Sequence, residues 1–424
     1  MNFEGLTKLF KLKDLRNKII FVFLMMVVFR AAAAIPVPGI NPESLAKFFK
    51  RNQIFGLMNI FTGGALQRVS VVMLGIGPYI TALIIMQLLT LVFPRLEEMY
   101  KEEGEEGQRK FNQYARILTV PLAALQSFAM LRLLESQKII NGFTGFKLLT
   151  SVVTITAGSI FLMWLGELIS EKGIGNGISL LIFAGIVAHF PESIRQATLT
   201  WDPSQIPSWI IFIISSLLIT TSIVIINEAR RNVPISYAKR IRGHRIYGGA
   251  QTYLPMMINP AGVMPIIFAL SIMMLPGMVG AFMKNMSRHF ISRVGVFLVS
   301  FSQNQILYGI CYFVLVVAFT YFYTAVTFDP DNVSENLQKM GGFIPGIRPG
   351  KNTAEFLRKI LNRVLFVGAV FLGIVAVMPS IVRAITGISG FDFLLGGTSL
   401  LIIVAVVLET VEIIKSEIEL RSYE

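Results

Sequence analysis

Long apolar runs alternate along this chain with short polar and charged segments. A helix needs about 20 mostly apolar residues to cross a hydrocarbon layer about 30 Å thick. The runs lack the period-two alternation of barrel strands, so helices are the expected form. Ten runs are close to the required length, and the predicted spans are residues 18–38, 70–93, 112–134, 148–170, 174–190, 208–227, 253–280, 304–326, 360–382 and 393–414.

Composition supports a membrane protein. Hydrophobic residues make up 54% and charged residues only 15% of the 424 positions, with a mean hydropathy of +0.66. One water-soluble core cannot hold so much apolar surface, so lipid must be part of the solvent. The first span follows a basic leader and ends in four alanines, as a cleaved signal peptide does. Arg30 interrupts that run, however, and the leader is long, so we expect a retained helix.

The sequence offers little catalytic chemistry. Cys311 is the lone cysteine and lies in an apolar span, where a packing role is expected. The three histidines lack metal-ligand spacing, so we expect no metal and no cofactor. Glu167 and Glu409 stand toward span ends, whereas ion-coupled transporters carry acidic residues or histidines within their spans. Residues 346–352 lack the spacing of a phosphate loop. We predict a passive channel, and not an enzyme, whose driving force comes from another protein or process.

Basic residues that flank the spans predict the orientation. Lys and Arg gather on the cytoplasmic side of membrane proteins, and they do so here when both termini are placed inside. Two of the resulting cytoplasmic loops, 228–252 and 327–359, are long and basic. Their candidate docking residues are Arg230, Arg231, Lys239, Arg240, Arg242, Arg245, Arg348 and Lys351.

These charges have two possible roles. They can simply fix topology and touch anionic lipid headgroups. Each loop is longer than that role requires, however, and residues 341–350 are punctuated by Gly and Pro in the manner of a rigid turn. We therefore predict a docking surface for an acidic partner or for RNA.

The chain contains an internal repeat. The segment GISLLI at 177–182 returns as GTSLLI at 397–402, and Gly-x-x-Pro-x-Ile at 75–80 returns at 262–267. Both matches pair a span with the fifth span after it, as a duplicated five-helix unit requires. Because five is odd, the second copy enters the membrane from the opposite side, and inverted repeats place the working site near mid-membrane.

The repeated motifs point to an apolar central cavity. Interrupted helices survive in a membrane only where protein or a water-filled cavity satisfies the freed backbone groups. The side chains that the repeat places at that cavity are Ile80, Ile182, Ile267 and Ile402.

A short apolar segment precedes the second span. Residues 53–66 are apolar enough to leave water but too short to cross the membrane. Such a segment is re-entrant or interfacial. It either packs under a constriction as a stopper or remains an interfacial loop.

Six motifs together resemble a known family. They are FTGGAL at 61–66, GPYI at 77–80, GIGNGIS at 173–179, NPAGV at 259–263, PGIRPG at 345–350 and GGTS at 396–399. In this order they look like the signature segments of the SecY family, the central channel subunit of the bacterial Sec translocon. The resemblance runs from about residue 18 to the end. It implies a protein-conducting channel in the bacterial plasma (inner) membrane, multi-pass, with both termini cytoplasmic.

The resemblance also implies an architecture and site residues. The fold would be all-α, with ten helices as two inverted five-helix repeats around a pore. The pore ring would be Ile76, Ile80, Ile178, Ile182, Ile267 and Ile402. The plug would be residues 55–66, including Phe55, Gly56, Leu57, Met58, Asn59, Ile60, Phe61, Thr62, Gly63 and Gly64. The lateral gate, between spans two and three and spans seven and eight, would carry Gln87, Thr90 and Asn259.

One position departs from the family pattern. Pro260 directly follows Asn259, which leaves the local helix geometry of the gate open. Implied partners are small membrane subunits of the SecE and SecG type, the SecA motor ATPase, the ribosome, secretory and membrane-protein substrates, and the lipid bilayer.

The predicted organisation divides the chain into five parts. They are an amphipathic N-terminal segment 1–17, a first half 18–190, an external hinge loop 191–207, a second half 208–414 and a cytoplasmic tail 415–424. A secondary transporter of an apolar or amphipathic small molecule, also built on inverted repeats, is the alternative function. A lipid-modifying enzyme would need a cluster of polar and charged residues at one membrane face.

Overall fold

A computed structural model gives the fold. It describes residues 13–37, 65, 69–101, 103–136, 145–199, 206–237, 240–242, 245–247, 251–284, 289–386 and 397–422. The predicted plug residues 55–64 and Lys239 therefore lie outside the described residues, as do residues 1–12 of the N-terminal segment.

Helices occupy the ten predicted places. They are α2 (Lys13–Ala34), α5 (Gly77–Thr90), α7 (Gly104–Ser136), α8 (Gly145–Lys172), α9 (Gly177–Leu199), α10 (Ile206–Glu228), α11 (Met264–Lys284), α13 (Gln305–Thr327), α15 (Lys351–Thr386) and α16 (Gly397–Ser422). The all-α membrane architecture is confirmed. The described part of the chain also contains the helices α6 (Pro94–Lys101), α12 (His289–Gln303) and α14 (Pro330–Lys339).

Among the described residues, five helices are long and apolar enough to span by themselves, and α5 with α6 forms a sixth candidate bent by 113°. Shorter apolar stretches cover 177–188, 213–228 and 264–277, which belong to the longer helices α9, α10 and α11. Two of these three, α9 and α11, carry the repeated motifs.

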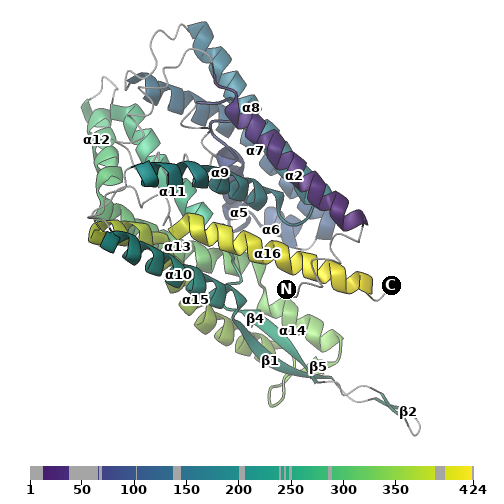
Figure 1. Cartoon of the computed structure of the whole chain (residues 1–424). Coiled ribbons are helices and arrows are strands. Elements are labelled where there is room, and N and C mark those ends of the chain that lie inside the picture. The colour runs from purple at the N-terminus through teal and green to yellow at the C-terminus, as the bar shows by residue number, and fades with distance from the viewer. Residues whose placement is uncertain are drawn as a thin grey trace.

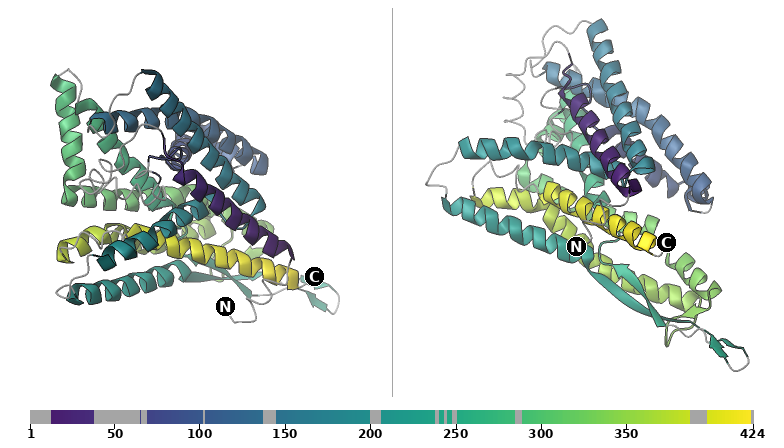
Figure 2. Two further views of the ribbon diagram at one scale, coloured as in Figure 1. Left: turned by 45° about the horizontal axis from the view of Figure 1, so that its top comes forward. Right: turned by 45° about the vertical axis from the view of Figure 1, so that its right-hand side comes forward.

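The helices form two groups that meet in one core. In Figure 1, α2, α7 and α8 lie above, and α10, α15 and α16 lie below, with α9 and α11 between them. Contacts between the groups join α5 to α11, α7 to α11, and α9 to α16. One buried hydrophobic cluster runs through both groups, from Phe29 in α2 to Val406 in α16. Figure 2 shows the same division from two further directions.

The two long basic loops fold into one unit. Strand β1 (Arg230–Tyr237) pairs antiparallel with β4 (Gln251–Met257), with Val233 opposite Leu254. The other edge of β1 pairs with β5 (Gly342–Phe343) from the second loop, with Ser236 opposite Phe343. A small hydrophobic cluster beneath the sheet contains Val233, Met256, Ile344, Leu357 and Leu361. We call the end of the helix bundle that carries this unit the sheet end.

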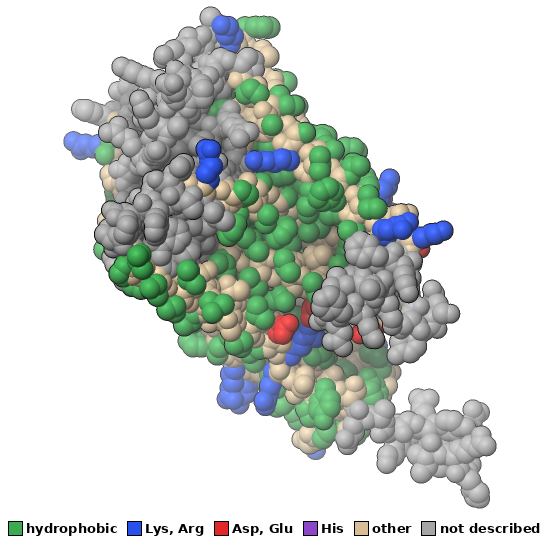
Figure 3. Space-filling model, viewed as in Figure 1, with side chains coloured by type: hydrophobic (Ala, Val, Ile, Leu, Met, Phe, Trp, Pro, Cys, Tyr) green, Lys and Arg blue, Asp and Glu red, His purple; other side chains and the backbone are tan. Residues whose placement is uncertain are grey.

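Hydrophobic side chains form a broad band across the middle of the face shown in Figure 3. Lys and Arg side chains stand at its lower edge, near β1, and others stand toward the top and the sides of the view. This distribution fits a chain whose middle faces hydrocarbon and whose sheet end faces water.

The seventh span begins later than predicted. It was expected from residue 253, but residues 251–257 form β4 and the helix starts at Met264. Side chains alternate in this strand: Met256 is buried, whereas Tyr253 and Met257 are exposed. That period of two was hidden by the high average hydropathy. Pro260 falls in the turn before α11, so it does not disturb the helix.

Other element bounds also differ from the predicted segments. Helix α9 continues to Leu199, into the segment expected as a hinge loop. The predicted loop 327–359 contains α14, β5 and the start of α15, and α16 continues to Ser422 through most of the expected tail. Asp329 caps α14 by accepting a hydrogen bond from Asp331 N at 2.9 Å, and Pro330 opens that helix.

Candidate pore between the two halves

The structure brings all six predicted ring residues into the same hydrophobic cluster. Ile76, Ile80, Ile182, Ile267 and Ile402 are buried members of it, and Ile178 is partly buried against them. Four of the six, Ile76, Ile80, Ile178 and Ile182, come from the first half of the chain, and Ile267 and Ile402 come from the second half. The four isoleucines that the internal repeat singled out, Ile80, Ile182, Ile267 and Ile402, are therefore buried in the one hydrophobic cluster that both halves share.

The first pair of repeated motifs has the same backbone geometry. Gly75 and Gly262 both have a φ of 59°, a left-handed conformation that L residues other than glycine rarely adopt. Each glycine stands two residues before its helix, α5 or α11, and a proline follows at the second helical position. In both copies of the repeat, a left-handed glycine therefore interrupts the chain just before the helix begins.

The second pair of motifs opens α9 and α16. Gly177 and Gly397 are the first residues of these helices. Asn176 caps α9: its Oδ1 accepts hydrogen bonds from Ile178 N at 3.0 Å and Ser179 N at 3.3 Å. Ile182 then lies one turn beyond Ile178, so the two side chains share a face of α9.

The repeat partners also contact each other. Helix α5 packs on α11 and α9 packs on α16, so each helix that carries a repeated motif contacts the helix that carries the matching motif in the other half. Within the described residues no group of three His, Cys, Asp or Glu side chains could hold a metal ion.

The predicted plug segment ends at a firmly held residue. Ala65 is fully buried, and its carbonyl accepts a hydrogen bond from Ser70 N at 2.8 Å. Val37 N donates to Val69 O at 2.9 Å, which ties the end of the first span to the chain before α5. These contacts anchor the C-terminal boundary of the predicted plug beside the core.

The predicted gate residues are buried polar groups in two places. Gln87 and Thr90 lie near the end of α5, where Thr90 Oγ1 donates to Gln87 O at 2.6 Å. Asn259 lies just before α11, and its Nδ2 donates to Asn227 Oδ1 at 3.0 Å and to Gly262 O at 3.1 Å. The sequence did not single out Asn227, which stands on α10.

Three of these polar groups are incompletely satisfied. Gln87 Oε1, Asn259 Oδ1 and Asn227 Nδ2 are buried and have no hydrogen-bond partner within the described part of the chain. Burying an amide group without a partner costs about 1–3 kcal/mol. A rearrangement that supplies partners to these atoms would recover that cost.

The predicted docking residues gather on the unit at the sheet end. Arg230, Arg231, Arg348 and Lys351 are exposed there, and Arg230 forms an ion pair with Glu412 of α16. Arg240 and Arg242 belong to β2 (Arg240–Arg242), and Arg245 to β3 (Arg245–Tyr247), which pair as a hairpin beyond the sheet. Figure 1 shows that hairpin projecting from the sheet end. Residues from two distant loops thus lie on one surface.

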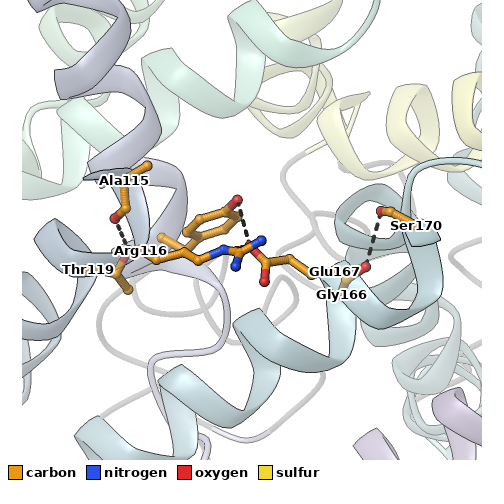
Figure 4. A network of polar contacts seen from close by, with 7 residues as sticks. Ala115, Arg116, Thr119, Gly166, Glu167 and Ser170 are labelled. Atoms are coloured by element: carbon orange, nitrogen blue, oxygen red, sulfur yellow. Dashed lines mark hydrogen bonds and ion pairs between the residues drawn. The ribbon is translucent and has the colours of Figure 1, made fainter. Parts of the chain in front are cut away.

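Sequence reasoning missed a polar network beside the ring. Arg116 Nε of α7 donates to Glu167 Oε1 of α8 at 2.6 Å, and the Tyr79 hydroxyl of α5 donates to the same oxygen at 3.4 Å. Figure 4 shows Arg116 and Glu167 pointing toward each other between their helices. The signal was present in the sequence, because both residues are charges at predicted spans.

Comparison with known proteins gives concordant results. A sequence profile of the SecY family matches residues 70–411. The protein translocase subunit SecY of Thermotoga maritima is 43% identical over 426 residues, covering 98% of this chain and 95% of that protein. The protein translocase subunit SecY of Aquifex aeolicus is 42% identical, covering 99% and 98%.

Solved structures share the fold. A structure described as that of a protein conducting channel superposes with a TM-score of 0.65 at 19% identity, covering 94% of this chain and 91% of that one. Sec61 in a canine ribosome-channel complex superposes with a TM-score of 0.62 at 19% identity, covering the same shares.

The helical membrane architecture, the family match and the solved channel structures of the same fold define the class as protein-conducting membrane channels. The chain belongs to the SecY family.

Proposed function

We propose that this chain is the channel subunit of a bacterial protein translocase, which passes unfolded polypeptides across the plasma membrane and releases apolar segments sideways into lipid. The observation that carries the proposal is that all six predicted ring isoleucines belong to, or pack against, one hydrophobic cluster shared by two halves whose repeat-bearing helices contact each other. A secondary transporter is not favoured, because the family match covers the chain from residue 70 to 411.

An apolar ring suits this task. Water and ions avoid a narrow hydrophobic constriction, so the ring seals the resting pore without a specific lock. A passing polypeptide presents every kind of side chain, and branched aliphatic side chains accommodate them without binding any one tightly. Segment 55–66 acts as the plug that adds to this seal.

The lateral gate is the seam of α5 and α7 against α11 and α13. Contacts of α11 with α5 and α7 support this placement. Gln87 and Asn259 contribute buried amide oxygens that have no hydrogen-bond partner among the described residues. Opening the seam lets water or substrate satisfy these atoms, which lowers the free energy cost of separating the helices. An apolar segment in the open seam then partitions into lipid.

The sheet end faces the cytoplasm and docks the machine that supplies the driving force. This placement puts both termini and the two basic loops inside, in accord with the distribution of Lys and Arg. The exposed Arg231, Arg348 and Lys351 provide positive charge for the ribosome or for the SecA motor. Small SecE- and SecG-type subunits complete the complex.

Reconstitution tests the proposal. The chain, with SecE- and SecG-type subunits, is placed in lipid vesicles and supplied with the SecA motor, ATP and an unfolded secretory precursor. We expect the precursor to become resistant to added protease only in vesicles that contain the chain. A chain that instead moves a small amphipathic solute and leaves the precursor accessible would contradict the proposal.

A further inference from the structure

Two consecutive residues of α8, Gly166 and Glu167, contact the two first-half helices that carry ring isoleucines. Helix α9 carries Ile178 and Ile182, and α5 begins directly after Ile76 and carries Ile80. Each helix reaches this dipeptide by a different kind of contact.

Gly166 positions the start of α9. A Cβ atom added to Gly177 would lie only 1.9 Å from the carbonyl oxygen of Gly166. The two backbones are therefore in direct contact. A Cβ on Gly166 would lie 3.5 Å from Ile178 Cγ1. Ser170 Oγ, one turn further along α8, accepts a hydrogen bond from Gly177 N at 2.8 Å. These contacts leave α9 little freedom to slide along α8.

Glu167 tethers the start of α5. Tyr79 stands between the two predicted ring residues Ile76 and Ile80, and its hydroxyl donates to Glu167 Oε1 at 3.4 Å. Ile76, at the N-cap position of α5, makes no side-chain capping hydrogen bond. Backbone turns hold the chain before α5, where Gly77 N donates to Leu74 O at 3.2 Å, and the Tyr79 hydroxyl adds a side-chain contact to the neighbouring helix α8.

Arg116 holds the carboxylate that Tyr79 uses. Its Nε donates to the same Oε1 at 2.6 Å, a short charge-assisted bond from α7. A charge among membrane helices is kept only when it is paired, so the Arg116 contact fixes where the Glu167 carboxylate lies. Helices α5, α7 and α8 are joined at one oxygen atom.

We propose that Glu167, fixed by Arg116, is a positioning residue for the closed pore. Through Tyr79 it holds Ile76 and Ile80 in register with Ile178 and Ile182, which the adjacent Gly166 positions. This inference rests on the proposed function, because it assumes that the isoleucines form a seal. Loss of the tether lets the first turn of α5 shift, which opens gaps in the apolar ring without unfolding the helix bundle.

The test measures leakage of the resting channel. The full chain and its variants are reconstituted in planar lipid bilayers, and ion conductance is recorded without motor or substrate. Tyr79→Phe removes only the hydroxyl, and Glu167→Gln removes the charge at constant shape. Glu135→Gln is the matched control, because Glu135 pairs with Arg132 within α7 at 2.7 Å. We expect a several-fold rise in conductance for the first two variants and none for the control.

Two further measurements make the outcome decisive. Thermal unfolding separates positioning from folding: unchanged melting temperatures with raised conductance support the proposal, whereas conductance that rises only with lost stability overturns it. Ile267→Asn, in the ring itself, separates the two proposals. Leakage in Ile267→Asn with none in Tyr79→Phe overturns the tether and keeps the ring. Absence of leakage in both overturns the ring and the tether together.

Discussion

Gly75 and Gly262 share a φ of 59°, and each stands two residues before one of two helices, α5 and α11, that pack against each other. The glycines are 187 positions apart in the sequence. The shared conformation is a structural counterpart of the sequence repeat, and it places the start of both helices inside the molecule. In each copy a predicted ring residue, Ile80 or Ile267, follows five positions after the glycine.

The contribution of the left-handed backbone at Gly262 to stability can be tested by comparing it with a helical glycine, Gly77. We expect Gly262→Ala to lower the free energy of unfolding by about 1–2 kcal/mol, because its Cβ meets nothing within 4 Å and only the backbone conformation is strained. Gly77→Ala also adds a Cβ into open space, but Gly77 is helical, so that variant should be neutral or slightly stabilised. Thermal unfolding in detergent measures both. Equal effects would show that the φ of Gly262 is not the determinant.

Position 177 should tolerate an added methyl group far less well than position 262. A Cβ there would lie 1.9 Å from the Gly166 carbonyl oxygen, so Gly177→Ala forces α9 away from α8. We expect a loss of about 1–3 kcal/mol in stability. Gly145→Ala, where a Cβ meets nothing within 4 Å, is the control and should retain the parent melting temperature.

Ring isoleucines should behave differently from ordinary core residues. We expect Ile267→Asn, and more weakly Ile402→Asn, to let the channel export a reporter with a crippled signal sequence. Each change places an amide in a constriction closed only by apolar contact, so the ring wets and opening costs less. The measurement compares export of one reporter with an intact and with a crippled signal.

The control for the ring is Ile155→Asn, at a fully buried site of α8 outside the cluster that contains the ring. Ile155→Asn should lower the free energy of unfolding by about a few kcal/mol, as other substitutions in a packed core do. It should reduce export of both reporters to the same extent. If the ring variants also lose both reporters with no relative gain for the crippled signal, these isoleucines pack the fold and do not gate a pore.

Arg348 is exposed on the unit at the sheet end, and its carbonyl accepts a hydrogen bond from Thr353 Oγ1 at 3.0 Å. We expect Arg348→Glu to slow motor- or ribosome-dependent translocation while the protein still accumulates, because a docking charge contributes little to packing. Lys147→Glu reverses an exposed charge at the start of α8 and should leave the rate unchanged. Equal rates for Arg348→Glu and the parent would remove Arg348 from the docking surface.

Deleting residues 57–64 tests the plug. Ala65 is kept because it is fully buried and bonded to Ser70. We expect greater ion leakage through the resting channel, with protein transport retained, because a second closure below the ring is lost. Conductance at the parent level in planar bilayers would instead favour the interfacial-loop interpretation.

Much of this architecture was readable from local sequence. Hydropathy placed all ten helices, because a helix that faces lipid must be apolar over most of its length. The repeat identified four of the six predicted ring residues, because its two copies share both a glycine position and an isoleucine five residues later. Hydropathy wrongly predicted that most of residues 251–257 belong to a membrane helix. These residues form a strand because they pair with β1.

What the sequence determined by itself was the number, order and inverted duplication of the spans, since these follow from patterns within about 20 residues and from their repetition. Only the tertiary structure joined the two basic loops through β1 and β5, and only it placed Arg116, Tyr79 and Glu167 at one carboxylate oxygen. The reason is physical. An apolar run specifies that a helix lies in lipid but not which neighbour it packs against, whereas close backbone approaches such as Gly166 to Gly177 and shared hydrogen-bond acceptors fix those partners.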